Sequence, residues 1–219
     1  MKTETASQTK RPRGRPRSFD REQALDSAME VFWEKGFEGA SLADLTDAMG
    51  VNPPSLYSAF GDKESLFLEA VERYVSQRGE SCDYCGAATA KDAVRMLLDY
   101  MAEDLTSSAH PRGCLMMMAS TTTSAASPKL QAALSKLQGL SRTRLRERIQ
   151  CGIAAGEMPA DTDAAALTAF YNAVMTGMSV MAKDGATRKS LVATVETAMR
   201  AWPDAPAGAK KRKAATARA

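Results

Sequence analysis

The sequence has a single histidine, His110, and it lacks the short motifs that accompany most enzyme active sites. It contains no G-x-S-x-G nucleophile elbow, no phosphate-binding P-loop and no dinucleotide-binding G-x-G-x-x-G. General acid–base catalysis and metal binding rely most often on histidine. An enzyme is therefore the least favoured class of function, and we predict no catalytic residue.

Long uninterrupted hydrophobic runs are also missing. No apolar segment follows the basic N-terminal residues, so no secretory signal is expected. The most apolar stretch, residues 164–182, is interrupted by Thr168, Asn172 and Ser179, among others, which favours a buried helix over a membrane span. We expect a cytoplasmic protein with no membrane partner.

Cysteine is scarce, with four residues in the chain. In the cytoplasm these are expected to be reduced thiols. Cys82 and Cys85 have C-x-x-C spacing, but a zinc site needs two further ligands. Cys114, Cys151 and His110 form no second paired motif. We predict no metal site and no cofactor. For Cys82 and Cys85 two alternatives remain: a regulatory dithiol, or thiols without a specific function.

The net charge of +3 conceals an uneven distribution along the chain. Residues 1–18 contain six Lys/Arg and one Glu, and residues 205–219 contain five Lys/Arg and no acidic residue, so each end carries +5. Residues 19–204 therefore carry 3 − 10 = −7. Basic ends on an acidic body are typical of solvated tails that contact a polyanion, most commonly nucleic acid.

The N-terminal segment contains KRPRGRPR, which resembles the AT-hook through its core Arg13-Gly14-Arg15-Pro16. Proline keeps such a strand extended, glycine lets it lie flat, and arginine side chains enter the narrow, electronegative minor groove of A·T-rich DNA. We expect Arg13 and Arg15 to contact DNA. The alternative is an ordinary basic tail, which would add affinity without sequence preference.

Residues 41–67, SLADLTDAMGVNPPSLYSAFGDKESLF, have the pattern of two short helices joined by a tight turn. Ser41 is a suitable N-cap, and Gly50 suits the left-handed position that ends a helix. Asn52 can cap the next helix, and Pro53 suits its first position because no N–H is needed there. This pattern predicts a helix-turn-helix.

One helix precedes this pair and another follows it. Residues 20–35 form a helix with a capping residue at Asp20, and Gly36 ends it. Asp62 begins a longer helix that runs to about Gly79. A helix pair of about twenty residues cannot bury its apolar side alone, so we expect the flanking helices to pack on it.

Several of these residues resemble the tetracycline-repressor (TetR/AcrR) family of bacterial transcriptional regulators. The shared motifs are G-V at 50–51, S-L-Y at 55–57, Phe60 and K-E-x-L-F at 63–67, preceded by FWEKGFEGASL. The match covers about residues 19–75. The resemblance implies an all-α fold of about nine helices, with an N-terminal three-helix DNA-binding domain and a C-terminal ligand-binding and dimerisation bundle.

The resemblance further implies a DNA-binding regulator, a repressor released from its operator by a small molecule or an electrophile. Its partners would be double-stranded DNA with a palindromic operator, a second copy of the chain and an inducer. The expected divisions are a disordered basic arm at 1–18, the DNA-binding domain at 19–80, the ligand-binding and dimerisation domain at 86–204, and a disordered basic tail at 205–219.

The second helix of the pair has small side chains and no Arg or Gln. Bidentate base contacts are therefore scarce, and contact with thymine methyl groups is favoured as direct readout. Two consecutive prolines also remove N–H groups that bind phosphate at many helix starts. We expect base contacts from Asn52, Pro53, Pro54, Ser55 and Ser58, and phosphate contacts from Ser41, Tyr57 and Lys63.

The remaining residues predict a helical bundle. Its expected helices cover residues 91–107, a short segment from Cys114, residues 128–155, a helix from about Asp161, and a last helix that ends at Pro203. In the helix from Asp161 two strips recur at helical spacing. The bulky strip is Leu167, Phe170, Val174, Met178 and Met181, and the small strip is Ala169, Ala173 and Gly177. Small strips allow close helix packing, which agrees with the dimer that the resemblance implies.

For the inducer we expect an adaptable apolar cavity with Met117 and Met175 in its wall, because methionine conforms to irregular ligands. Tyr100 and Tyr171 would supply polar contacts. Core packing is the alternative for each methionine. Cys114 follows His110 and Arg112 at a helix start, which predicts a lowered thiol pKa and a sensor for electrophiles.

An architectural, nucleoid-type protein is the alternative function. It would use both basic ends without a specific operator. It would not explain the separate helical unit with an apolar interior.

Overall fold

The computed structural model describes residues 19–81, 86–122 and 128–204, and in these ranges it has nine α-helices and no strand. The all-α prediction is confirmed. The helices are α1 (Arg21–Gly39), α2 (Leu42–Met49), α3 (Pro53–Phe60), α4 (Lys63–Ser81), α5 (Ala90–Asp104), α6 (Leu115–Thr122), α7 (Pro128–Ala154), α8 (Ala164–Lys183) and α9 (Arg188–Met199).

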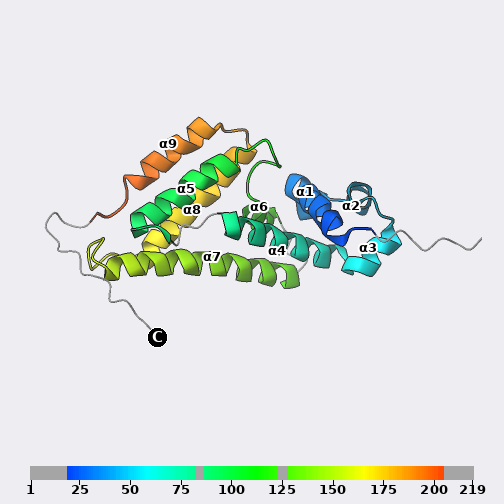
Figure 1. Ribbon diagram of the computed structural model, residues 1–219, viewed down its shortest axis with the longest axis horizontal. Helices are drawn as coiled ribbons and strands as arrows, with labels where there is room; N and C mark the ends of the chain where they lie inside the picture. The colour runs from blue at the N-terminus through cyan, green and yellow to red at the C-terminus, as the bar shows by residue number, and fades with distance from the viewer. Residues whose placement is uncertain (1–18, 82–85, 123–127, 205–219) are drawn as a thin grey trace, which may run out of the picture.

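The molecule is elongated, and α1, α2 and α3 form a head at one end (Figure 1). Helix α4 leads from this head towards a bundle of α5, α7, α8 and α9, while α6 lies between the two parts (Figure 1). One continuous cluster of buried hydrophobic residues runs through both parts. The head and the bundle are therefore packed against each other.

Helix α1 begins where the sequence predicts. Asp20 Oδ1 accepts hydrogen bonds from the backbone N–H groups of Glu22 and Gln23, at 3.0 and 3.2 Å. The end of this helix differs from the prediction, because the chain kinks at Gly36 with φ 73° and remains helical to Gly39. Glycine adopts this left-handed backbone without the steric cost that other residues pay.

The helix-turn-helix is confirmed in its local detail. Ser41 Oγ accepts from the Asp44 N–H at 3.0 Å, and Asp44 Oδ2 accepts from the Ser41 N–H at 2.9 Å, so α2 begins with a capping box. Gly50 ends α2 with φ 65°. Asn52 Oδ1 then accepts from the Ser55 N–H at 2.9 Å, which starts α3.

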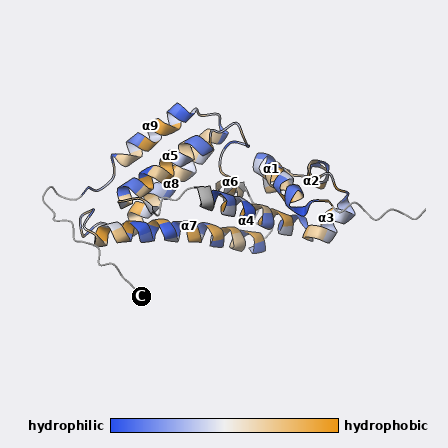
Figure 2. Cartoon of the chain, in the orientation of Figure 1, coloured by the Kyte–Doolittle hydropathy of each residue, from blue (hydrophilic) through white to orange (hydrophobic). Residues whose placement is uncertain are grey.

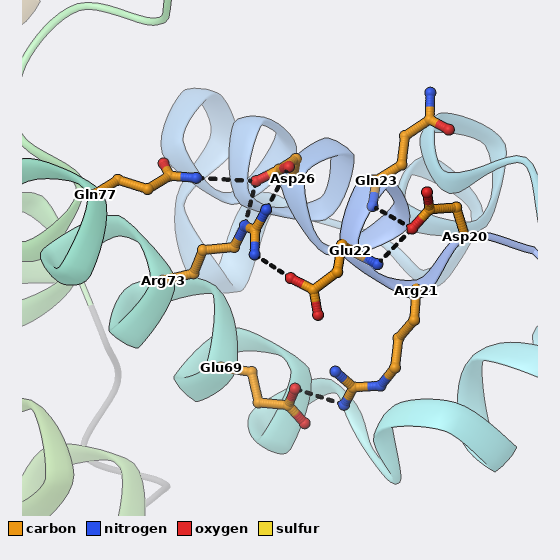
Figure 3. A network of polar contacts seen from close by, with 8 residues as sticks. All are labelled: Asp20, Arg21, Glu22, Gln23, Asp26, Glu69, Arg73 and Gln77. Atoms are coloured by element: carbon orange, nitrogen blue, oxygen red, sulfur yellow. Dashed lines mark hydrogen bonds and ion pairs between the residues drawn. The ribbon is translucent and has the colours of Figure 1, made fainter.

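Helix α4 is tied to α1 by charged side chains (Figure 3). The Arg73 guanidinium donates to both Asp26 and Glu22, and its Nη2 lies 2.8 Å from Asp26 Oδ2. Arg21 Nη2 donates to Glu69 Oε2 at 2.6 Å. These pairs join the middle of α4 to the first turns of α1.

In the bundle, α9 packs against α5 and α8, and α7 packs against α5 and α8. Hydrophobic and hydrophilic residues alternate along α7, as expected for a helix with one buried face (Figure 2). Leu134, Leu145 and Ile149 form its buried side. Gly152 on the same side brings α7 close to the first residue of α5, Ala90.

Helix α8 corrects two predictions. It is capped by Asp163 and begins at Ala164, three residues after the expected start. The bulky strip is only partly inward: Met178 is fully buried, whereas Phe170 is 40% exposed. Helix α8 is also the one described helix that meets the length and composition of a membrane span. One of its faces packs into the bundle against α7 and α9.

Candidate nucleic-acid interface and ligand cavity

Helix α3 presents one face to solvent and one to the head. Leu56 and Phe60 are buried, at 0% and 3% exposure, on the side of α3 that packs against α2 and α4. Tyr57 is 47% exposed, which leaves its hydroxyl free to reach a partner outside the protein. The structure brings the predicted base-reading residues together on this outward side: Asn52, Pro53, Pro54 and Ser58 are exposed and Ser55 is half-buried.

The Asn52 side chain has a double use. Its oxygen accepts the capping hydrogen bond from the Ser55 N–H, and its NH2 group can donate to a base acceptor. Tyr57 and Ser58 follow one turn later on the exposed side. The surface is small and uncharged.

Two predicted phosphate-contacting residues have partners within the protein. The Ser41 hydroxyl donates to Asp44 Oδ2 at 2.7 Å, and Lys35 Nζ lies 2.5 Å from the other oxygen of the same carboxylate. Lys35 and Ser41 together hold the pKa of Asp44 well below its usual range. Lys63 Nζ lies 4.6 Å from the Phe37 ring centroid, and partial burial lowers its pKa. A phosphate contact by Ser41 would have to replace its bond to Asp44.

Other predicted residues lie outside the part of the chain that the structure describes. These are Arg13 and Arg15 of the N-terminal arm and the pair Cys82 and Cys85. Within the described residues, no group of three or more His, Cys, Asp or Glu has the arrangement of a metal site.

A cavity of about 450 Å³ lies between α4, α5, α6, α7 and α8. Its volume is within the usual range for a small-molecule site. Tyr100, Met117 and Met175, which were predicted as effector contacts, line it together with Cys114. Other apolar lining residues are Val75, Leu97, Met101, Leu105, Met116 and Leu145.

Tyr171 is not part of this cavity wall, so the structure does not bring it together with the other predicted effector contacts. Its side chain is fully buried, and its hydroxyl donates to the Ala198 carbonyl oxygen at 3.2 Å. The ring lies 5.6 Å from the ring of Trp202. Burial raises the pKa of Tyr171 to about 12. Tyr171 fastens α9 to α8.

The predicted lowering of the Cys114 pKa is also wrong. The thiol is buried, and the loss of hydration raises its pKa despite favourable contacts with Tyr74 and backbone N–H groups. Arg112, which was expected to lower the pKa of the thiol, instead donates from Nη2 to the Ala186 carbonyl oxygen at 2.5 Å. His110 in turn contacts Asp104, with Nε2 3.2 Å from Oδ1.

The structure reveals a polar and aromatic junction between the head and the cavity that the sequence did not indicate. Trp33 of α1 donates from Nε1 to the Gly113 carbonyl oxygen at 2.9 Å, and its ring stacks on His110 at 4.4 Å. The Arg78 guanidinium lies 4.4 Å from the Trp33 ring centroid. It also makes two hydrogen bonds to Asp104, at 3.1 and 3.2 Å.

Arg78 and Asp104 also line the cavity, so this junction connects the cavity wall to the head. We define the junction by Trp33, Arg78, Asp104, His110 and Gly113. No motif marks these residues, and Trp33 and Gly113 are 80 positions apart in the sequence. The sequence offers only the presence of a tryptophan and of the single histidine, and no characteristic spacing links these two residues.

The outward side of α8 is apolar and exposed. The small strip Ala169, Ala173 and Gly177 faces solvent, and Val180 at the end of this side is 41% exposed. A methyl group built on Gly177 meets no atom within 4 Å. Exposed apolar faces of this kind are typical of protein–protein interfaces.

Comparison with known proteins agrees with this architecture. Residues 24–70 match the family model described as bacterial regulatory proteins, tetR family, and residues 90–202 match the tetracyclin repressor-like C-terminal domain. The chain is 34% identical over 207 residues to the HTH-type transcriptional repressor ComR of Escherichia coli (strain K12), covering 93% of this chain and 99% of ComR. It is 30% identical to the HTH-type transcriptional repressor BdcR of the same strain, covering 89% and 94% of the two chains.

Among solved structures, the chain resembles a cysteine-substituted form of the TetR family transcriptional regulator CifR in complex with 26-bp double-strand operator DNA. The TM-score is 0.82 at 48% identity, and the match covers 87% of this chain and 100% of CifR. Both family models follow the division between head and bundle, and the relatives match over nearly their whole length. The chain therefore belongs to the tetR family of bacterial regulatory proteins and is a helix-turn-helix transcriptional regulator.

Proposed function

We propose that this protein is a repressor that binds a palindromic operator as a homodimer and releases it when a small molecule enters the cavity. The observation that carries the proposal is the outward face of α3, where Asn52, Tyr57 and Ser58 are exposed beside two prolines. The relatives ComR and BdcR are repressors, and the CifR structure contains operator DNA.

In this proposal α3 lies along the major groove. Its side chains offer one amide NH2 group, two hydroxyl groups and two pyrrolidine rings, and no cation. Such a surface favours thymine methyl contacts and leaves most of the affinity to phosphate contacts and to DNA shape. Tyr57 and Lys63 would contact the DNA backbone, and Arg13 and Arg15 would reach the minor groove in the flanks.

The dimer would form through the outward side of α8. Two identical heads about one duplex turn apart, roughly 34–36 Å, match the symmetry of a palindrome. The apolar strip with Phe170 and Val180 supplies a surface that is costly to leave in water. The dimer also explains why this helix carries apolar residues on both sides.

The junction would transmit ligand binding to DNA. A ligand in the cavity would contact the wall that contains Arg78 and Asp104. Displacement of Arg78 would then change the packing of its guanidinium on the Trp33 ring. Because Arg73 ties α4 to α1, the head then shifts as a unit. A coupling of about 1–3 kcal/mol, or a 5- to 150-fold change in operator affinity, is sufficient for regulation.

The test is selection of bound fragments from the source genome, followed by footprinting. A defined protected palindrome supports the repressor, whereas uniform coverage of DNA supports the architectural alternative. Ser58→Glu places a negative charge on the exposed side of α3 and is expected to abolish the footprint. Ser76→Glu makes the same change on the exposed side of α4 and is the matched control.

A further inference from the structure

The cavity has an apolar body and an unbalanced charge. Its apolar wall includes Val75, Leu97, Leu105, Met116 and Met175. These side chains suit a hydrocarbon or aromatic group, and methionine adapts to its outline. Among the residues that the structure describes, the charged side chains in the same wall are three arginines and a single aspartate, so their formal sum is 3 − 1 = +2.

One of the three arginines is already neutralised. Arg78 makes two hydrogen bonds to Asp104, and both side chains are largely buried, at 19% and 17% exposure. The guanidinium is also held over the rings of Trp33 and Tyr74, at 4.4 and 4.1 Å from the centroids. Asp104 supplies the only carboxylate that the described part of the chain contributes to the cavity wall, and it is hydrogen-bonded to Arg78.

The excess charge belongs to Arg142 and Arg144 of α7. Neither side chain forms an ion pair with any residue that the structure describes. Both residues are exposed to solvent at the side of the cavity. Arg148, one to two turns further along α7, instead donates to the Ala87 carbonyl oxygen at 3.2 Å.

Two uncompensated guanidinium groups beside an apolar cavity favour a ligand of matching composition. A bound apolar group removes water from the wall, which strengthens the attraction between a guanidinium and an anion there. A neutral ligand of the same shape would fill the apolar part and leave both charges without a partner. Polar neutral groups at the wall, such as Ser141 and Asn172, can add hydrogen bonds to an acid but do not balance the charge.

We propose that the cavity takes an amphipathic organic acid, with its apolar body among the methionines and leucines and its carboxylate at Arg142 and Arg144. This inference rests on the proposed function, since it names the chemical class of the effector. It assigns ligand selection to α7. Arg78 and Asp104 remain paired and respond to the ligand body.

The test uses three matched probe pairs that differ in charge and little in shape: octanoate with octanamide, 4-phenylbutyrate with 4-phenylbutanamide, and 1-naphthaleneacetate with 1-naphthaleneacetamide. Calorimetry on the full-length protein without DNA measures binding directly. We expect at least one acid to bind below 1 mM and at least tenfold more tightly than its amide, because hydrogen bonds to charged groups exceed neutral ones.

The double variant Arg142→Gln/Arg144→Gln is expected to lower the ratio of acid affinity to amide affinity at least tenfold. Arg146→Gln removes a charge from the same helix away from the cavity wall and should keep it. Equal affinity of acids and amides, failure of every acid to bind below 1 mM, or an acid preference that survives the double variant would overturn the proposal.

A separate DNA-binding assay distinguishes this inference from the proposed function. If an acid binds with the expected arginine dependence but leaves the operator complex intact, the ligand class stands and effector-controlled release fails. If only a neutral compound binds and releases DNA, effector-controlled release stands and the ligand class fails.

Discussion

Gly152 lies where α7 passes closest to the start of α5, and we predict that Gly152→Ala is less stable than its matched control Gly139→Ala. A methyl group at Gly152 would lie 2.6 Å from Ala90 Cβ and 2.8 Å from both Glu157 Oε2 and Met158 Cε. The methionine methyl can rotate away. Ala90 Cβ is fixed to the backbone of α5, so it moves only if the helix shifts. Glu157 Oε2 accepts the Ala90 N–H at 2.6 Å, so moving this carboxylate breaks that hydrogen bond.

The magnitude follows from two opposing effects. Overpacking of a tight contact costs about 1–3 kcal/mol. Alanine inside a helix gains up to about 1 kcal/mol over glycine. Gly139 lies in the same helix, and a methyl group there meets no atom within 4 Å, so Gly139→Ala receives only the gain. The helix gain cancels between the two variants, which should therefore differ by about 1–3 kcal/mol.

Urea denaturation at pH 7 and thermal unfolding measure this difference. For a chain of this size 1 kcal/mol corresponds to about 2–4 °C in Tm, so a difference of about 2 kcal/mol appears as roughly 4–8 °C. We expect Gly139→Ala to unfold at or above the parent Tm and Gly152→Ala below that of Gly139→Ala. Equal stability of the two variants would refute the close approach of α7 to α5, and with it the shape of the cavity wall that these helices form.

Three further predictions concern the junction, the head and the dimer. Trp33→Phe removes the buried donor to the Gly113 carbonyl oxygen, which costs about 1–3 kcal/mol of folding stability, and should weaken effector-induced DNA release about tenfold in a gel-shift titration. Trp202→Phe is the matched control. Unchanged release by Trp33→Phe would exclude the junction from signalling. Arg73 lowers the pKa of Asp26 below its ordinary 3.8, so the ion pair stabilises the fold above that pH, and this stabilisation is lost as pH falls through the folded pKa. Denaturation from pH 7 to 3 should therefore show that Asp26→Asn loses less unfolding free energy, relative to the parent, below about pH 4. A loss that does not depend on pH would contradict the ion pair. Val180→Glu charges the outward side of α8 and should convert a dimer into a monomer in analytical ultracentrifugation without unfolding it, whereas an unchanged dimer would place the interface elsewhere.

The head could be predicted from its sequence because its signals are local. Ser41 and Asn52 cap helices through hydrogen bonds to backbone groups three residues away, and Gly50 ends α2 through its own backbone angles. Leu56 and Phe60 repeat at helical spacing, which identified the buried side of α3 and, by exclusion, the side that faces solvent. Such interactions are encoded within one or two turns of chain.

The cavity was less predictable, because its side chains come from five helices. The local sequence around Cys114 suggested a lowered pKa from Arg112 and His110. In the structure Arg112 turns to Ala186, and burial of the thiol raises the pKa instead. Tyr171 has a hydroxyl group that suits a polar ligand contact, yet packing against α9 makes this side chain part of the core.

By itself the sequence determined the helices, the helix-turn-helix and its outward residues, since caps, turns and hydrophobic spacing act between neighbours in the chain. Only the tertiary structure decided which side chains share the cavity wall, which of its arginines already have a partner, and how Trp33 meets the loop before α6. Those features depend on contacts between residues far apart in sequence, and burial there outweighs the local chemistry of each residue.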